Sequence, residues 1–134
     1  MPLRYLLDTN TVSYAFRGNF PSVRQRLLRV PMSEIAISAV TEGELRFGVA
    51  HKPQATNLRR IAEEFLARVD ILPWDSRAAD RYANLRVALE SAGTPMGNLD
   101  MMIAAHALAA DLVLVTHDRV FQRVRGLKLE DWAK

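Results

Sequence analysis

Short apolar runs alternate with helical periodicities along the whole chain, and this alternation restricts the fold more than any other feature. Buried strands are expected at 3–7, 34–38, 70–74 and 112–116, with an edge strand at 127–131. Helical spacing of apolar residues recurs between them, at 9–17, 22–29 after a turn at 18–21, 40–51, 58–69, 75–92 and 99–110. Strands that alternate with helices form βαβ units. The sequence therefore predicts an α/β fold, a three-layer α/β/α sandwich around a mostly parallel central sheet.

The 134 residues are expected to form a single domain, residues 1–134, because no linker, repeat or change of composition divides them. No cysteine is present, which excludes disulfides, zinc–thiolate sites and thiol chemistry. No apolar run approaches the roughly 20 residues of a membrane span, and the N-terminus lacks a secretory pattern. We therefore expect a cytoplasmic protein with no membrane partner.

Four acidic residues fall where a parallel sheet would gather them. Asp8 ends the first strand, in "YLLDTN", and Glu44 lies early in the helix after the second strand. Asp100 lies in the first turn of helix 99–110, and Asp118 follows the fourth strand. The carboxyl ends of parallel strands and the starts of the following helices share one edge of the sheet, where ligands bind. All four carboxylates should therefore point to this edge.

Each of these acids also has a plain structural explanation. Asp8 suits a turn, the pair Thr41 and Glu44 fits a capping box, and Asp100 and Asp118 suit the start of a helix. This explanation weakens for the set, because like charges that meet at one point repel and raise one another's pKa. Such a cluster costs stability unless a cation lies between its members.

The chemistry of the four side chains indicates which cation that would be. An all-oxygen set of carboxylates selects a hard divalent ion such as Mg²⁺ or Mn²⁺. Such an ion lowers the pKa of a bound water and neutralises the charge that develops on phosphorus. Fifteen of the eighteen basic residues are Arg, which binds phosphate through paired hydrogen bonds, and the net charge is +3. The pattern favours metal-dependent hydrolysis of a phosphodiester.

Five segments carry a resemblance to a known family. They occur in the order "LLDTN", "ISAVTEGELRFGV", "LDMMIAAHALA", "LVTHDRVF" and "GLKLEDW". Together they resemble the PIN-domain ribonucleases, and among them the VapC toxins of toxin–antitoxin pairs. The resemblance implies a Mg²⁺- or Mn²⁺-dependent endoribonuclease. It also implies that Asp8, Glu44, Asp100 and Asp118 are both the metal-binding and the catalytic carboxylates.

The resemblance implies supporting residues and partners as well. Asn10 and Thr116 match the polar positions that support the carboxylates in this family. The implied partners are an RNA substrate, a second copy of the chain in a homodimer, and a cognate antitoxin whose C-terminal segment wraps the toxin. Asn98 stands where many relatives have proline; since Asn is a good N-cap, we expect no loss of function. The pattern does not indicate which residues contact RNA.

Two other functions stay open on the sequence. A phosphatase or phospho-accepting domain also uses an acidic edge, but "DTNTV" lacks the second acid that such a loop needs. A non-catalytic RNA-binding module would keep the fold and lose some of the acids, and none is lost here. His106 and His117 are expected to point away from the acids. Arg17, Arg24 and Arg26 could line a path for RNA, but they are expected instead to form a solvated helix face.

Overall fold

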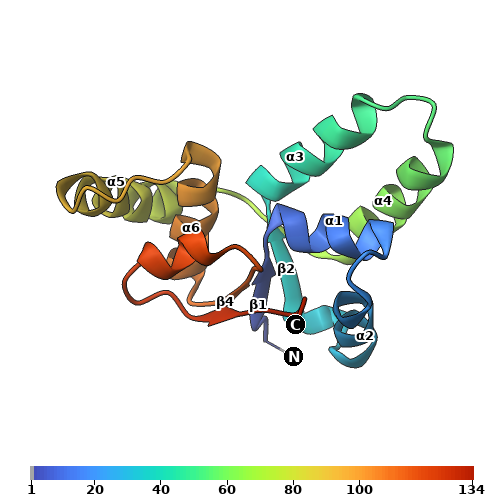
Figure 1. The fold of residues 1–134 in the computed structure, drawn as a ribbon, viewed down its shortest axis with the longest axis horizontal. Helices are drawn as coiled ribbons and strands as arrows, with labels where there is room; N and C mark the ends of the chain where they lie inside the picture. The colour runs from blue at the N-terminus through green and yellow to red at the C-terminus, as the bar shows by residue number, and fades with distance from the viewer. Residues whose placement is uncertain (1) are drawn as a thin grey trace.

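The computed structural model describes residues 2–134, which form a five-stranded sheet with helices on both faces (Figure 1). The strands are β1 (Tyr5–Leu7), β2 (Ile35–Ser38), β3 (Asp70–Leu72), β4 (Val113–Val115) and β5 (Leu129–Glu130). Their order in the sheet is β3-β2-β1-β4-β5, and every pairing is parallel. The predicted α/β fold with a mostly parallel sheet is confirmed, and the edge strand expected at the end of the chain pairs with β4.

Six α-helices and two short 3₁₀ helices connect the strands. The α-helices are α1 (Thr9–Arg17), α2 (Pro21–Arg29), α3 (Ala39–Ala50), α4 (Thr56–Arg68), α5 (Ser76–Ser91) and α6 (Asn98–Ala110). The 3₁₀ helices are η1 (Met32–Glu34) and η2 (Arg119–Arg123), and neither was expected from the sequence. Local chemistry sets several of these starts, since the side chains of Asp8, Ser38 and Asp75 each accept a backbone N–H as N-caps of α1, α3 and α5.

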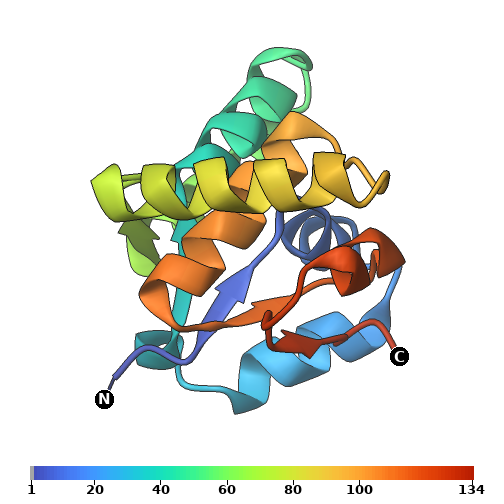
Figure 2. The same ribbon diagram turned by 90° about the vertical axis from the view of Figure 1, so that its left-hand side faces the viewer.

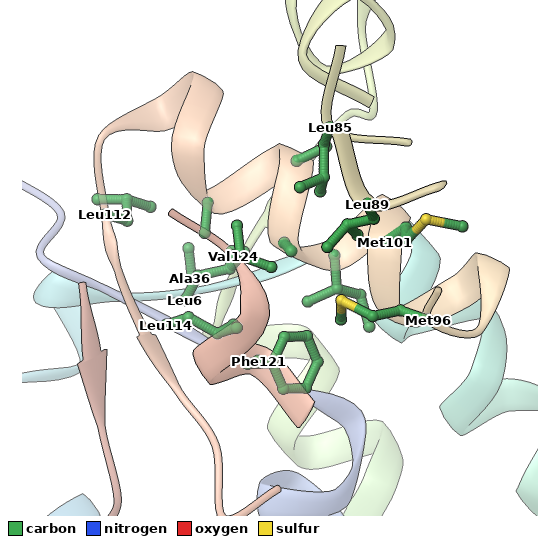
Figure 3. Close-up of a cluster of buried hydrophobic side chains, with 14 residues drawn as sticks. Leu6, Ala36, Leu85, Leu89, Met96, Met101, Leu112, Leu114, Phe121 and Val124 are labelled. Carbon is green, nitrogen blue, oxygen red and sulfur yellow. The ribbon is translucent and has the colours of Figure 1, made fainter. Parts of the chain in front are cut away.

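Alternating side chains on the strands divide the core into two layers. Leu6, Ala36 and Leu114 point to one face, where they pack with residues of α5, α6 and η2 (Figure 3). The next residues along the strands point to the other face, and they pack against α1, α2 and α4; they include Tyr5, Leu7, Ile35, Ile37 and Val115. This is the period of two that a strand imposes on its side chains. Figure 2 shows α5 and α6 together on the near face of the sheet.

The parallel arrangement fixes where function can lie. All strand C-termini point to one edge, and α1, α3 and α6 begin there, directly after β1, after β2 and before β4. Within residues 2–134, no helix combines the length and the apolar character needed to pass through a bilayer. The carboxyl edge of the sheet is therefore the place to look for the four acidic residues.

Candidate active site at the carboxyl edge

Asp8 is the most buried of the four acids, with only 4 % of its surface exposed. It is the N-cap of α1, and its Oδ1 accepts the backbone N–H of Thr11 at 2.8 Å. Burial raises the pKa of the Asp8 carboxyl above its ordinary value. Hydrogen bonds from Thr116 and Thr11 oppose this, while the charge of Asp118 adds to it. Asp8 therefore caps α1, where the plain explanation held that it suits a turn, and it does so buried and next to another acid.

Asp100 lies near enough to the other three acids for their charges to affect it. It lies in the first turn of α6, and partial burial is the main cause of its raised pKa. The charges of Asp118, Asp8 and Glu44 raise the pKa of Asp100 further, in that order. Coulomb interaction of this kind needs carboxylates that are near each other. All four acids therefore share the carboxyl edge, although they come from positions spread over more than a hundred residues of sequence.

Glu44 is held by a residue that the sequence analysis did not single out. The hydroxyl of Thr9 donates to Glu44 Oε1 at 2.5 Å and lies 3.2 Å from the hydroxyl of Thr41. The N-cap of α3 is Ser38, whose Oγ accepts from Val40 N–H, so a capping box between Thr41 and Glu44 does not account for Glu44. Thr9 follows Asp8 directly, and only the meeting of α1 with α3 gives it a role.

Asp118 is the fourth acid of the cluster, and Thr116 contacts it. Asp118 is exposed, and its Oδ1 accepts the N–H of Val120 at 2.9 Å to cap η2. Its own backbone N–H donates to Thr116 Oγ1 at 3.1 Å. Thr116 is buried, and its side chain also bonds Asp8 in a way that lowers the pKa of that carboxyl. One hydroxyl thus connects the two acids that follow the neighbouring strands β1 and β4.

Asn10 lies differently from Thr116. Its side chain is exposed, and it takes part in none of the side-chain hydrogen bonds found within residues 2–134. The neighbouring residue Thr9, and not Asn10, donates a hydrogen bond to an acid of the cluster, Glu44. A supporting role for Asn10 stays a prediction.

The donor set suits a divalent ion in its chemistry. Glu44 and Asp118 each use one carboxylate oxygen in a positioning hydrogen bond and keep the other, whereas Asp8 accepts from both Thr11 and Thr116. Asp100 accepts none of the side-chain hydrogen bonds found in the described residues, so both its oxygens remain. Among residues 2–134, however, no three acidic or histidine side chains are yet grouped at the spacing that encloses one ion.

The histidines take the positions expected of them, outside the acid cluster. His106 is buried, and its Nδ1 lies 2.7 Å from Ser38 Oγ. Burial lowers the pKa of His106, while the charge of Asp75 opposes this. His117 turns to Asp131, with Nδ1 2.8 Å from Oδ2. Neither histidine faces the carboxylates as an acid–base partner.

Two arginines differ from expectation. Arg24 donates to the carbonyls of Ala15 and Phe16 at the end of α1. Arg26 pairs with Glu130 at 3.0 Å and lies over the ring of Trp132. Arg24 is exposed, as a solvated helix face requires, and Arg26 is half-buried; what was not expected is their contacts with α1 and with the end of the chain. Spacing along α2 gives no signal of partners so distant in sequence.

Comparisons with known proteins agree with one another over nearly the whole chain. The PIN domain family matches residues 5–127. The chain is 36 % identical to the tRNA(fMet)-specific endonuclease VapC of Shigella flexneri, over 98 % of this chain and 99 % of that protein. It is 35 % identical to ribonuclease VapC2 of Rickettsia felis, over 97 % and 98 %. The structure of DNA-bound VapBC from Salmonella typhimurium superposes with a TM-score of 0.90 at 34 % identity, over 97 % of this chain and 98 % of that one.

Proposed function

The chain belongs to the PIN-domain family, as a ribonuclease of the VapC type from toxin–antitoxin systems, and on this premise we propose how its residues cut RNA. Asp8, Glu44, Asp100 and Asp118 are the catalytic and metal-binding carboxylates, and the metal is Mg²⁺ or Mn²⁺. One observation carries the proposal: three other acids raise the pKa of Asp100 at the edge where ligands of a parallel sheet bind. When bound, the ion supplies an activated water and neutralises charge on the phosphate.

The protein's own contribution is to hold the oxygens and move a proton. Asp8 and Asp118 accept hydrogen bonds from backbone N–H groups, and the hydroxyl of Thr116 contacts both residues, which positions them beside each other at the ends of neighbouring strands. Glu44 is fixed through Thr9 and keeps Oε2, which accepts the proton of the attacking water. The water oxygen bonds to phosphorus as the bond to the leaving ribose oxygen breaks. Asn10 supports this set from its exposed position.

The substrate of the reaction is RNA of the transfer-RNA class. The relative from Shigella flexneri is named for tRNA(fMet), and this chain is similar to it over nearly its full length. The arginine excess outside the acidic edge suits a polyanion of that size. Residues 1–134 act as one nuclease domain in the cytoplasm, where such RNA is found.

A cognate antitoxin inhibits the enzyme by covering its edge. Solved relatives carry the name VapBC, which denotes a toxin with its antitoxin. In this chain a groove of about 420 Å³ between α1, α3 and α4 is lined by Phe16, Leu45, Phe47 and Leu58 and ends at Glu44. An apolar segment of the antitoxin lies in this groove and brings a basic side chain to the carboxylates. The active form is a homodimer. The exposed apolar side chains of Phe47 and Leu99 are available for contact with the second copy of the chain.

RNA cleavage by the pure protein tests the proposal. We expect cleavage of transfer RNA with Mg²⁺ or Mn²⁺, none with EDTA, and none by the Asp100→Asn variant under any of these conditions. Glu63→Gln is the matched control, because Glu63 is an exposed acid on α4, away from the edge. Cleavage that survives EDTA, or that survives Asp100→Asn at the full rate, would contradict the mechanism. RNA binding without cleavage at any metal concentration would favour the non-catalytic module.

A further inference from the structure

A second groove lies on the α5 side of the molecule, and its charge is opposite to that of the acidic edge. It has a volume of about 610 Å³ and runs between α5, the turn after α5 and the segment that follows η2. Its floor is apolar, formed by Leu85 and Leu89. Arg81, Arg123 and Arg125 line it, all three exposed. Asp80 is the only acid among the lining residues, so the groove carries an excess of positive charge.

The guanidinium groups of the three arginines are not engaged in ion pairs with residues of the described part of the chain. None of them belongs to a salt bridge among the described residues, whereas Arg77 and Arg86 on the same helix pair with Asp75 and Glu90. Arg123 makes one hydrogen bond, from Nη1 to the carbonyl of Pro95 at 2.7 Å. This bond joins the two walls of the groove and leaves the rest of the guanidinium available. Guanidinium groups available in this way bind phosphate well.

Both walls of this groove lead from the acidic edge. The turn after α5 continues from Thr94 and Pro95 to Gly97, and Asp100 Oδ2 lies beside Gly97. The other wall begins at Asp118, which caps η2, and continues to Arg123 and Arg125. Figure 2 shows η2 next to the turn that follows α5. A strand whose scissile phosphate lies at the acids can therefore continue between the same two segments into the groove.

We infer that this groove binds the phosphodiester backbone of the RNA substrate beyond the bond that is cut. This rests on the proposed function, since it concerns the substrate of that same site. Arg81 and Arg125 contact phosphates, and the apolar floor packs against ribose or base. Arg123 positions the groove by holding the turn at Pro95. Long RNA gains affinity from the groove, whereas RNA that spans only the acidic edge gains none.

Binding of oligouridylate by an inactive form of the full chain tests the inference. In the Asp100→Asn background, we compare Arg81→Gln/Arg125→Gln with Arg29→Gln/Arg68→Gln. The second pair removes the same charge from exposed arginines on α2 and α4, on the other side of the sheet. We expect the groove variant to weaken binding of a long oligouridylate about tenfold or more. Its plot of log affinity against log salt should also be shallower by about 1.4, the value for two lost phosphate contacts to a single strand.

The controls separate this inference from the proposed function. Triuridylate should bind equally to all variants, and Arg81→Lys/Arg125→Lys should restore part of the long-RNA affinity because it restores charge. Equal loss in both double variants would overturn the inference, since it would reflect net charge alone. Loss of binding to polyglutamate but not to oligouridylate would also overturn it, and would assign the groove to an acidic protein segment. RNA cleavage by the unsubstituted protein is measured separately, so either idea can fail alone.

Discussion

Buried carboxylates at the two ends of the parallel sheet differ in whether a cation is paired with them. At the amino end, Glu34 is 5 % exposed and has a cation beside it: Arg4 Nη1 lies 3.3 Å from Glu34 Oε1. The backbone N–H of Arg4 also donates to the carbonyl of Glu34 at 2.9 Å. At the carboxyl end, Asp8 is buried to a similar degree, yet neither Asp8 nor Asp100 has a salt bridge among the described residues. The same strand, β1, is preceded by Arg4 and followed by Asp8.

The difference separates an acid paired with a cation from the acids that we propose to be functional. A buried carboxylate that is paired with a cation has its charge compensated within the folded chain and requires no added ion. Carboxylates that lie near one another without a cation raise one another's pKa. Their ionisation therefore lowers the free energy of unfolding. A site of this kind is matched to an added cation.

Asp8→Asn should abolish RNA cleavage, whereas Glu34→Gln should leave it nearly unchanged. Asn keeps the helix cap at position 8 but removes the charge that holds a metal. We expect a loss of at least about 10²-fold in kcat/KM for Asp8→Asn, on the scale of removing one essential charge-stabilising group. Steady-state cleavage of transfer RNA checks this. Equal losses in the two variants would erase the contrast between the ends.

Added Mn²⁺ should stabilise the protein through the carboxyl end only. A ligand that binds only the folded chain adds about 2.7 kcal/mol to the free energy of unfolding at a concentration of 100 times its Kd. Thermal unfolding with and without Mn²⁺ should show this gain in the unsubstituted protein and in Glu34→Gln. The gain should shrink sharply in Asp100→Asn. An equal gain in all three would place the metal elsewhere.

Without metal, the two substitutions should change stability in opposite directions. Asp8→Asn should raise the free energy of unfolding, because burial raises the pKa of Asp8 and makes its charged form costly in the folded chain. Glu34→Gln should lower it by about 1 kcal/mol or less, because Arg4 is largely exposed.

The stability gain of Asp8→Asn should also depend on pH with a defined sign. The pKa of Asp8 is raised in the folded chain, so ionisation destabilises the fold as pH rises above its ordinary value of 3.8. The gain should be present at pH 7 and vanish below about pH 3.8, where Asp8 is protonated in both states. Urea unfolding at several pH values measures it. A gain that persists unchanged in acid would point to packing rather than charge.

His106 provides the smallest test; it contacts Ser38 at the carboxyl end but lies outside the cluster of four acids. Burial lowers its pKa, so stability should be full above about 6.5 and fall as pH drops below that value, where the unfolded chain takes up a proton more readily. We expect a loss of about 1 kcal/mol or less between pH 7 and pH 6. His106→Gln should flatten this part of the curve. A curve of the same shape in both proteins would assign the loss to other groups.

The sequence could place Asp8, Glu44, Asp100 and Asp118 at one edge because parallel topology alone brings them there. Helix and strand boundaries were predicted to within a few residues, because the periodicity of apolar residues is a local property of the sequence. Thr9 and the partners of Arg24 and Arg26 could not be predicted. Their contacts join segments that are distant in sequence, such as Thr9 with Glu44 and Arg26 with Glu130. Nor could spacing reveal that the carboxylates are not yet grouped at metal-binding distances.

The central claim is that the four carboxylates close around one divalent ion, and crystallography with Mn²⁺ tests it most directly. Crystals grown with Mn²⁺ should show an anomalous peak bonded to oxygens of Asp8 and Asp100, at about 2.2 Å. Glu44 or Asp118 should complete the site, directly or through water. A saturated crystal with no peak at this edge, or with manganese bound elsewhere and these carboxylates turned apart, would contradict the account.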